Sequence, residues 1–343
     1  MRFGITFAAA IIAVIFTAAS PLPAGILTLT PAGLVDNFTL TTFATIDPGL
    51  TGNTGPFGIA VAANGTVLVN NFLDNTRYNF ADVDGQTLGS ALHAVPSNSS
   101  AIANATAGGQ AYGGVNGQFV QFNPDGTVNH ALTGVTETPW LGMWGNPVTG
   151  HILATTGQGQ LIDIDPLANG GTGAATVVHG SLGLGYDGVS VSPDGAIAYL
   201  AINNRILGFN IASGAQVFDS GLLAGFPDGV GVIASNSALN GQLVINFNGP
   251  TLNAGFVGLL DPASGNLTVI ASGGTRGDYA APDPSNGTLF LDYSDLIYRL
   301  NCGPNCAIGQ APAPPPPAGT PEPATLGLVA LSLAAIAAAR RNS

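Results

Sequence analysis

Three aspartates in the body of the chain are placed where they could do chemistry. Asp187, Asp228 and Asp278 each stand at the start of a short run of Gly, Val, Ser, Ala or Tyr residues, at intervals of 41 and 50 residues. If a repeated fold brings them to one axis, their carboxylates could hold Ca²⁺ or another hard cation, which prefers oxygen ligands. They could also raise one another's pKa and act as general acid or base. An Asp-Gly pair is equally a common turn element, and the sequence leaves these three interpretations open.

Other candidate residues are few. Glu137 is the one glutamate between the two ends of the chain; it stands just before the inner strand of the third unit and is a candidate fourth ligand beside the three aspartates. Asp82-Val-Asp-Gly85 resembles the start of a calcium loop, but the remaining ligands are absent, so we expect a turn. No serine-hydrolase elbow, zinc-protease or phosphate-loop motif is present. The histidines are far apart, and we expect His130 and His179 on exposed outer strands; the four are His93, His130, His151 and His179.

A degenerate repeat is the element that would position these residues. The stretch 187–214 reads as strand, Pro-Asp-Gly turn, strand, short turn and strand, and a fourth strand follows at 215–219. Its first strand recurs from Gly58, Gly142, Gly188 and Gly229, with a weaker copy from Asp278 and an eroded one near 101–104. Four strands per unit of 40–50 residues is the pattern of a β-propeller. We therefore predict an all-β, six-bladed propeller over residues 37–301.

Closing such a ring requires a strand from the other end of the chain. The sixth unit has no fourth strand of its own, because Asn301 runs directly into Cys302-Gly-Pro-Asn-Cys306. Residues 37–46 have the period and β-branched content of a strand and precede the first unit. We predict that this segment supplies the missing outer strand, which removes free sheet edges.

The repeat resembles those of NHL, YVTN and gluconolactonase-type propellers. The residues that carry the resemblance are Pro56-Phe-Gly-Ile-Ala-Val61 and Val189-Ser-Val-Ser-Pro-Asp-Gly195. This resemblance implies a scaffold that hosts hydrolases, lyases and binding modules. It also implies, for gluconolactonase-type enzymes, a metal site of Glu, Asn and Asp. The asparagines Asn203 and Asn204 fall at a blade turn, and the family's metal pattern cannot be matched residue by residue.

Both chain ends indicate export. Residues 1–24 have a basic start, an apolar run and small residues, which is the layout of a signal peptide. Residues 302–320 contain the two cysteines and a proline-rich spacer, and we expect a local disulfide between Cys302 and Cys306 in an oxidising compartment. Residues 321–343 comprise Pro321-Glu322-Pro323, an apolar run and Arg340-Arg341.

This last segment resembles a PEP-CTERM sorting signal. The resemblance implies recognition by an exosortase-type enzyme, an inner-membrane anchor formed by the C-terminal apolar helix, cleavage, and release to the envelope or the exterior. The arginine pair would stay on the cytoplasmic side.

Composition narrows the function further. The formal net charge is −12, and the chain has no lysine. Because such an acidic chain repels the phosphate backbone, we do not expect it to bind nucleic acid. We expect an exported binding or structural module of the envelope or extracellular matrix, with an extracellular polysaccharide as a candidate partner and Ca²⁺ as a candidate cofactor. The alternative is a lactonase-like hydrolase or lyase that uses an acidic metal site in the propeller channel.

Overall fold

The computed structural model describes residues 25–309, apart from 53, 98–102, 138–139, 181–182, 184–185 and 250–253. The expected signal peptide, most of the spacer and the sorting segment lie outside the described residues. Within the described part of the chain, no helix is long and apolar enough to cross a membrane.

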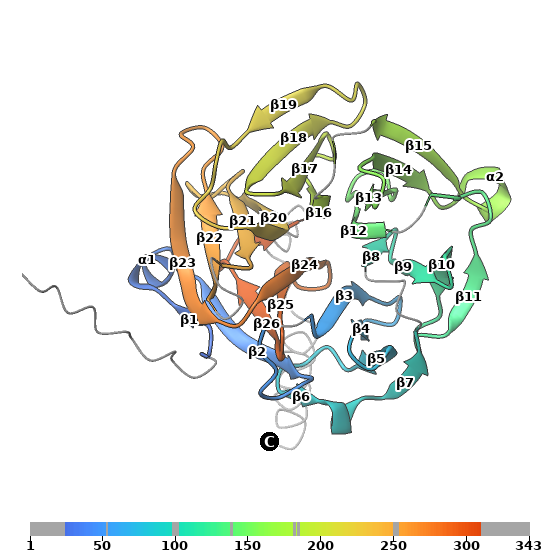
Figure 1. The fold of residues 1–343 in the computed structure, drawn as a ribbon, viewed down its shortest axis with the longest axis horizontal. Helices are drawn as coiled ribbons and strands as arrows, with labels where there is room; N and C mark the ends of the chain where they lie inside the picture. The colour runs from blue at the N-terminus through green and yellow to red at the C-terminus, as the bar shows by residue number, and fades with distance from the viewer. Residues whose placement is uncertain are drawn as a thin grey trace, which may run out of the picture.

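The described residues form six sheets arranged as blades around one axis, which confirms the predicted all-β, six-bladed propeller (Figure 1). The innermost strands of consecutive blades are neighbours around the ring, and the last of them contacts the first. Listed from the axis outward, blade 1 consists of β3 (Pro56–Val61), β4 (Val67–Asn71), β5 (Thr76–Phe80) and β7 (His93–Pro96). Blade 2 consists of β8 (Asn104–Ala107), β9 (Gln110–Val115), β10 (Gln118–Phe122) and β11 (Val128–Ala131). Blade 3 consists of β12 (Trp140–Gly145), β13 (Ile152–Thr156), β14 (Leu161–Asp165) and β15 (Ala174–His179).

The second half of the ring follows the same plan with added strands. Blade 4 consists of β16 (Tyr186–Val191), β17 (Ile197–Ile202), β18 (Arg205–Asn210) and β19 (Gln216–Asp219). Blade 5 consists of β20 (Pro227–Ser235), β21 (Leu243–Phe247), β22 (Gly255–Leu260) and β23 (Leu267–Gly274). Blade 6 consists of β24 (Gly277–Asp283), β25 (Thr288–Tyr293), β26 (Leu296–Asn301) and β2 (Thr39–Thr45). Short helical segments connect some successive strands: α1 (Pro31–Val35) lies before β2, η1 (Leu88–Ser90) before β7 and α2 (Ala168–Gly171) before β15.

The ring closes as the sequence predicted. β2 pairs antiparallel with β26, in register from Thr39 opposite Asn301 to Thr45 opposite Leu296. β6 (Gln86–Thr87), which lies between the third and fourth strands of blade 1 in the chain, then pairs in parallel with β2. Strands from both ends of the propeller therefore share one sheet, which leaves no free edge at the join.

A buried ion-pair group fastens this closure. Arg299 on β26 lies within 2.9 Å of Asp84 and 2.6 Å of Asp283, and also pairs with Asp82. The Asp82–Gly85 segment is therefore part of the closure, through Asp82 and Asp84. Arg299 also stacks over the ring of Phe43 at 5.1 Å, so the cation and the aromatic core of the sixth blade hold each other in place.

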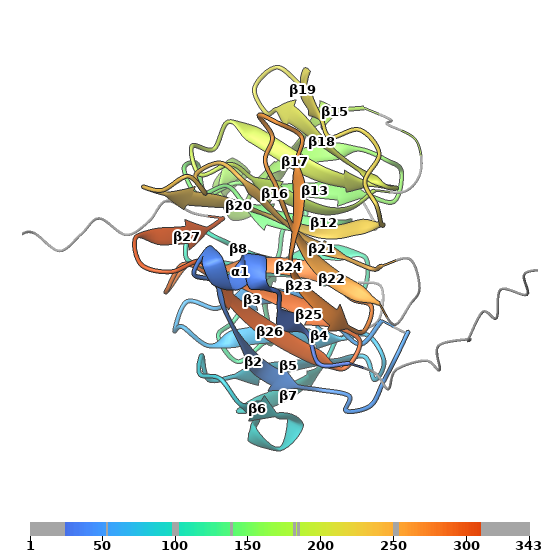
Figure 2. The same ribbon diagram turned by 90° about the vertical axis from the view of Figure 1, so that its left-hand side faces the viewer.

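The structure adds two pairings that the sequence did not predict. β1 (Thr28–Leu29) pairs with β23 at the outer edge of blade 5, and α1 follows on the outside of the ring (Figure 2). β27 (Cys306–Ile308) pairs with β20, with Ile308 opposite Ile233. Residues 302–309, expected as a turn and the start of a spacer, thus return to the innermost edge of blade 5. Cys302 and Cys306 form a disulfide, with their Cα atoms 5.7 Å apart, just before this return.

The closure has a direct test at Phe43. This side chain is fully buried on β2 and packs edge-on against Phe290 with ring centroids 4.8 Å apart. We expect Phe43→Ala to lower the free energy of unfolding by about 3–5 kcal/mol, because it leaves a cavity at the ring closure. Thr41→Ala, on the exposed side of the same strand, should change it by less than about 0.5 kcal/mol. Urea denaturation measures both, and equal effects would contradict a closure held by the buried face of β2.

Candidate functional site

The three predicted aspartates occupy equivalent positions in three consecutive blades. The inner strands β16, β20 and β24 each carry a β-bulge, between Tyr186 and Val189, between Pro227 and Val230, and between Gly277 and Ala280. Asp187, Asp228 and Asp278 are the first residues inside these bulges. A bulge re-aims its side chains out of the regular alternation of a strand. The repeat therefore delivers three carboxylates to the same level of the ring, at the end of the channel where the inner strands begin, here called the strand-start mouth.

Glycines make the close approach of these strands possible. A Cβ at Gly188 would lie 1.9 Å from the carbonyl oxygen of Asp228, and one at Gly142 would lie 2.3 Å from that of Asp187. At Gly229 it would lie 2.5 Å from the backbone nitrogen of Ala280. Only glycine allows backbone contact at this distance. This is the physical reason for the recurring glycine that revealed the repeat.

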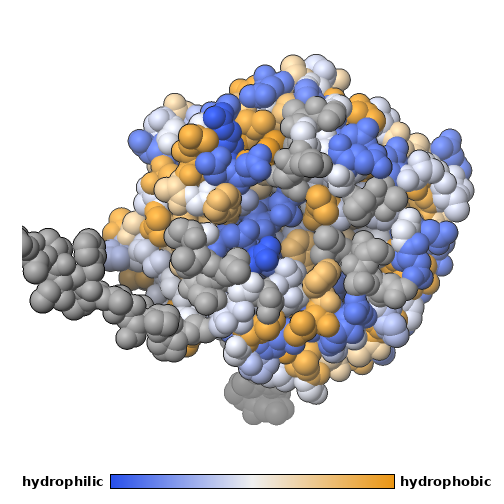
Figure 3. Space-filling view, viewed as in Figure 1, coloured by the Kyte–Doolittle hydropathy of each residue, from blue (hydrophilic) through white to orange (hydrophobic). Residues whose placement is uncertain are grey.

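The carboxylates form one network with a single arginine. The carboxyl groups of Asp187 and Asp228 lie close enough to shift each other's pKa. Asn248 Nδ2 donates to Asp228 Oδ2 at 3.0 Å, and Arg276 Nε donates to Asn248 Oδ1 at 3.1 Å while lying 2.5 Å from Asp278 Oδ1. Asp228 and Asp278 are each only 1% exposed. In Figure 3, hydrophilic residues also gather near the centre of the face drawn.

Burial dominates the electrostatics of the network. It raises the pKa of Asp187 to about 6, although the hydrogen bond to Asp228 and the charge of Arg276 act against the shift. Burial likewise raises the pKa of Asp278 to about 7, with Arg276 lowering it and Asp187 raising it. For Asp228 and for Asp292 on β25, burial and then neighbouring carboxylates raise the pKa well above its usual range. Near neutral pH the network therefore holds protons that a bound cation could replace.

The sequence did not identify the polar residues that support the bulges. On the second strands of blades 3, 5 and 6, the polar residues Thr155, Asn246 and Asp292 bond to backbone groups at the bulges, which include one between Trp140 and Met143 in blade 3. Thr155 Oγ1 accepts from Gly142 N and donates to Asp187 O, both at 2.8 Å. Asn246 Nδ2 donates to the carbonyls of Tyr279 and Asp292 at 3.1 and 3.0 Å. A polar residue inside an otherwise apolar, buried strand is the signal that could have revealed them.

Tyr279 closes the channel behind this network. Its hydroxyl lies 2.7 Å from the carbonyl oxygen of Asn104 and 2.8 Å from that of Met143, which belong to the inner strands of blades 2 and 3. Tyr279 comes from β24 on the other side of the axis (Figure 1) and is 1% exposed. Its ring also packs against Phe57, with centroids 5.1 Å apart. The buried ring thus separates the strand-start mouth from the opposite one, the strand-end mouth.

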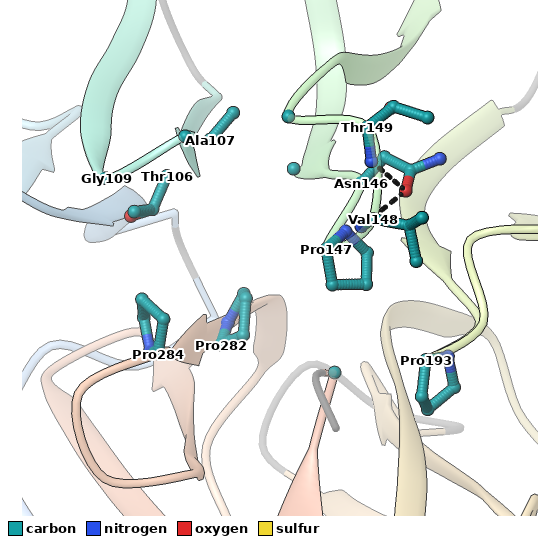
Figure 4. A pocket seen from close by; sticks show the side chains of 14 residues that line it. Thr106, Ala107, Gly109, Asn146, Pro147, Val148, Thr149, Pro193, Pro282 and Pro284 are labelled. Atoms are coloured by element: carbon teal, nitrogen blue, oxygen red, sulfur yellow. Dashed lines mark hydrogen bonds between the residues drawn. The ribbon is translucent and has the colours of Figure 1, made fainter. Parts of the chain in front are cut away.

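The strand-end mouth holds a pocket of different chemistry. It has a volume of about 630 Å³ and is lined by the ends of the inner strands and the turns that follow them (Figure 4). The described residues that line it include Thr106, Asn146, Val148 and Pro282, and none of the lining residues has a titratable side chain. Asn146 Oδ1 accepts from the backbone nitrogens of Val148 and Thr149, which fixes the shape of the wall.

Other predicted residues lie apart from the aspartates. Glu137 Oε2 accepts from its neighbour Thr136 N at 3.0 Å, and among the described contacts none joins Glu137 to the aspartates. His130 and His179 lie on the outer strands β11 and β15, as expected. His151 Nδ1 lies 3.1 Å from Asp163, in a second hollow of about 550 Å³ between blades 3 and 4. Within the described part of the chain, no group of three or more His, Cys, Asp or Glu side chains is arranged to hold a metal ion.

The raised pKa values predict how stability depends on pH. A carboxyl group that is easier to protonate when folded stabilises the fold fully below its ordinary pKa near 4. That contribution is lost as pH rises through about 6 for Asp187 and about 7 for Asp278. We expect Tm to be several degrees higher at pH 5 than at pH 8, and Asp228→Asn to flatten this slope. Asp261→Asn is the control, because Asp261 is only partly buried and a hydrogen bond from Ser264 lowers its pKa, so the pH dependence that it contributes lies below pH 4. A wild-type slope kept by Asp228→Asn would contradict the prediction.

Known proteins share two features with this chain, the C-terminal sorting motif and the propeller fold. Residues 320–341 match the PEP-CTERM protein-sorting motif. A gluconolactonase from Xanthomonas campestris has a similar structure, with a TM-score of 0.57 and 16% identity over 80% of this chain and 94% of that one. A streptogramin B lyase aligns over 77% of this chain and 97% of its own, with 13% identity and a TM-score of 0.45. No curated protein matches the sequence. Sequence identities this low support a shared fold and carry no information about a shared activity. The chain is therefore a six-bladed propeller of gluconolactonase-like fold that carries a C-terminal PEP-CTERM motif, which implies an exported, envelope-associated substrate of an exosortase.

Proposed function

We propose that the exported propeller is a binding module of the envelope or extracellular matrix, and that its ligand site is the pocket at the strand-end mouth. One observation carries this proposal. The pocket is large enough for a small ligand or a segment of a polymer, yet its described lining offers no acid, base or metal ligand. The groups that could do such chemistry lie at the other mouth, where Asp228, Asp278 and Asp292 are buried. A hollow without titratable groups supports recognition rather than catalysis.

The charge of the chain points to the class of ligand. The formal net charge is −12, and acidic residues such as Asp125 and Asp194 stand in turns at the strand-end side of the ring. An anionic polymer would be repelled. A neutral polysaccharide could place its hydroxyl groups against Thr106 and Asn146 and its apolar faces against the proline rings of the wall. Before release, the C-terminal segment would hold the module at the inner membrane, where an exosortase-type enzyme acts on Pro321-Glu322-Pro323.

Affinity electrophoresis through gels that contain dextran, a neutral polysaccharide, or alginate, an anionic one, tests this proposal. We expect dextran to retard the wild-type protein and alginate to leave it unretarded. Val148→Glu should abolish the retardation, because it places a charge in the pocket wall; Val148 is 64% exposed, so the fold should tolerate the change. Val217→Glu, on the outer strand β19 and 54% exposed, is the matched control and should be retarded like the wild type. Absence of retardation in dextran, or equal retardation of both variants, would count against the proposal.

A second candidate function rests on the carboxylates at the strand-start mouth. Oδ2 of Asp292 and Oδ1 of Asn246 are buried without a hydrogen-bond partner. Such orphaned acceptors are costly, and a hard cation would satisfy them. The donor chemistry of Asp187, Asp228 and Asp278 fits Ca²⁺, which would displace the protons that the network holds at neutral pH. If the mouth also opens to a substrate, the same cation could support a lactonase-like hydrolase or lyase.

Thermal melting with calcium tests the cation site. At pH 8, where the aspartates ionise more readily, 5 mM CaCl₂ should raise Tm of the wild type by several degrees. Asp228→Asn should remove most of that shift, whereas Asp261→Asn, at a position in blade 5 outside the carboxylate network, should keep it. A wild-type Tm that does not respond to calcium, compared with magnesium at the same ionic strength, would exclude a calcium site in the folded protein.

A further inference from the structure

Two hollows on the strand-end side of the ring share one wall. The strand-end pocket is lined by the turn that follows β12, and the same turn lines part of the hollow of about 550 Å³ between blades 3 and 4, here called the interblade hollow. Asn146 and Thr149 belong to both linings (Figure 4). On the facing side, the turn that follows β16 contributes Pro193 to the pocket and Gly195 to the interblade hollow. The interblade hollow therefore continues the pocket outward from the axis.

A hydrogen bond fixes the junction between the two hollows. Asn146 Nδ2 donates to the carbonyl oxygen of Gly195 at 3.1 Å, which joins the turn of blade 3 to the turn of blade 4. Asn146 is 4% exposed, so this contact forms the buried floor of the junction, whereas Thr149 beside it is exposed and within reach of a ligand. Gly195 has a φ of +73°, and a Cβ there would lie 2.6 Å from Asn146 Oδ1. The junction therefore has its shape before any ligand arrives, which lowers the entropy cost of binding.

The interblade hollow can hold the same class of ligand as the pocket. Its apolar surface includes Val177, which is 48% exposed, and Ile211. Its polar surface includes the hydroxyl group of Thr149 and the carboxylate of Asp163. His151 Nδ1 lies 3.1 Å from Asp163, whose side chain is 24% exposed, so this carboxylate can still accept from a hydroxyl group of a ligand. Sugar units present both hydroxyl groups and apolar ring faces, and the lining of the interblade hollow offers a counterpart to each.

Size and charge are consistent with one chain that occupies both hollows. Volumes of about 630 and 550 Å³ each lie in the range that holds a small-molecule ligand. A ligand that fills both is therefore an oligomer rather than a single unit. An anionic oligomer would approach the carboxylates of Asp163 and Asp165 beside His151, and these would repel it.

We propose that the strand-end pocket and the interblade hollow are two subsites of one groove, and that a neutral polysaccharide chain passes from the first over Thr149 into the second. This path rests on the proposed binding function and adds the direction in which the chain leaves the pocket. Once one stretch of the chain lies in the pocket, the next stretch meets the interblade hollow at an effective concentration in the millimolar range. Weak contacts in the two subsites then combine, so the affinity depends on the length of the chain.

Methyl NMR of the full chain in detergent tests this path. A dextran fragment of about eight units should shift the methyl resonances of Val148, in the pocket, and of Val177, in the interblade hollow, with one shared dissociation constant, because one chain occupies both subsites. Isomaltose, the disaccharide of dextran, is too short to join the subsites and should bind at Val148 at least about tenfold more weakly. The methyl groups of Val217, on β19 and 54% exposed, are the internal control and should not shift.

Two substitutions in opposite walls of the interblade hollow isolate its contribution. Val177→Glu in blade 3 and Ala212→Glu in blade 4 each place a charge there, and both positions are exposed, so Tm should stay that of the wild type. Each should weaken binding of the dextran fragment, measured at Val148, by about tenfold or more. Val217→Glu is the matched control and should bind the fragment like the wild type.

The outcomes distinguish this path from the binding function itself. Shifts at only one of the two valines, or wild-type affinity in both hollow variants, would overturn the second subsite while the pocket keeps its function. Shifts at Val148 and Val177 with different dissociation constants would also overturn it, in favour of two independent sites. If the dextran fragment shifts neither valine, the proposed binding function fails, and the path fails with it.

Discussion

The whole propeller depends on close backbone contact between neighbouring inner strands. At Gly142, Gly188 and Gly229 the next strand is so near that a Cβ would overlap its backbone. At these three contacts the inner strands can converge this closely because each has a glycine there and a bulge that turns the chain. Ring geometry, and not catalysis, thus requires the recurring glycine. The aspartates occupy the adjacent bulge position, so they meet at the axis as a consequence of the same constraint.

Close contact at the axis also explains why the carboxylates are unusual. Bulges expose backbone groups that a regular ladder would pair, and Thr155, Asn246 and Asp292 satisfy them from the second strands. Asp292, which bonds to the backbone of the bulge, is buried beside Asp278. Burial raises the pKa of Asp228 and Asp292, and neighbouring carboxylates raise it further. Arg276 provides one positive charge for this group of acids. The network is therefore held together by protons near neutral pH, which couples the stability of blades 4 to 6 to pH.

The sequence predicted the parts of this structure that leave a local signal. The repeat of glycine followed by apolar residues predicted six blades, and residues 37–46 had enough β-branched residues to predict the closing strand. β1 and β27 are two and three residues long, and such short strands exist only because a partner edge is available. Tyr279 was predicted only as part of a weak strand, because its bridge to Asn104 and Met143 joins residues more than 130 positions apart. Glu137 precedes the inner strand β12, whereas the aspartates lie within the bulges of their inner strands, so its carboxylate is not brought to the axis.

The two ends of the channel can be used independently because Tyr279 lies between them. Its buried ring spans the axis and is fixed at its hydroxyl by two backbone carbonyls, so neither mouth can pass a ligand to the other without breaking these contacts. The strand-start mouth therefore contains buried carboxyl groups, whereas the described lining of the strand-end pocket is uncharged. The chain itself leaves through the second mouth at Gly309. The described chain that leads to the PEP-CTERM motif therefore ends at the mouth with the open pocket, while the carboxylates lie at the opposite end of the ring.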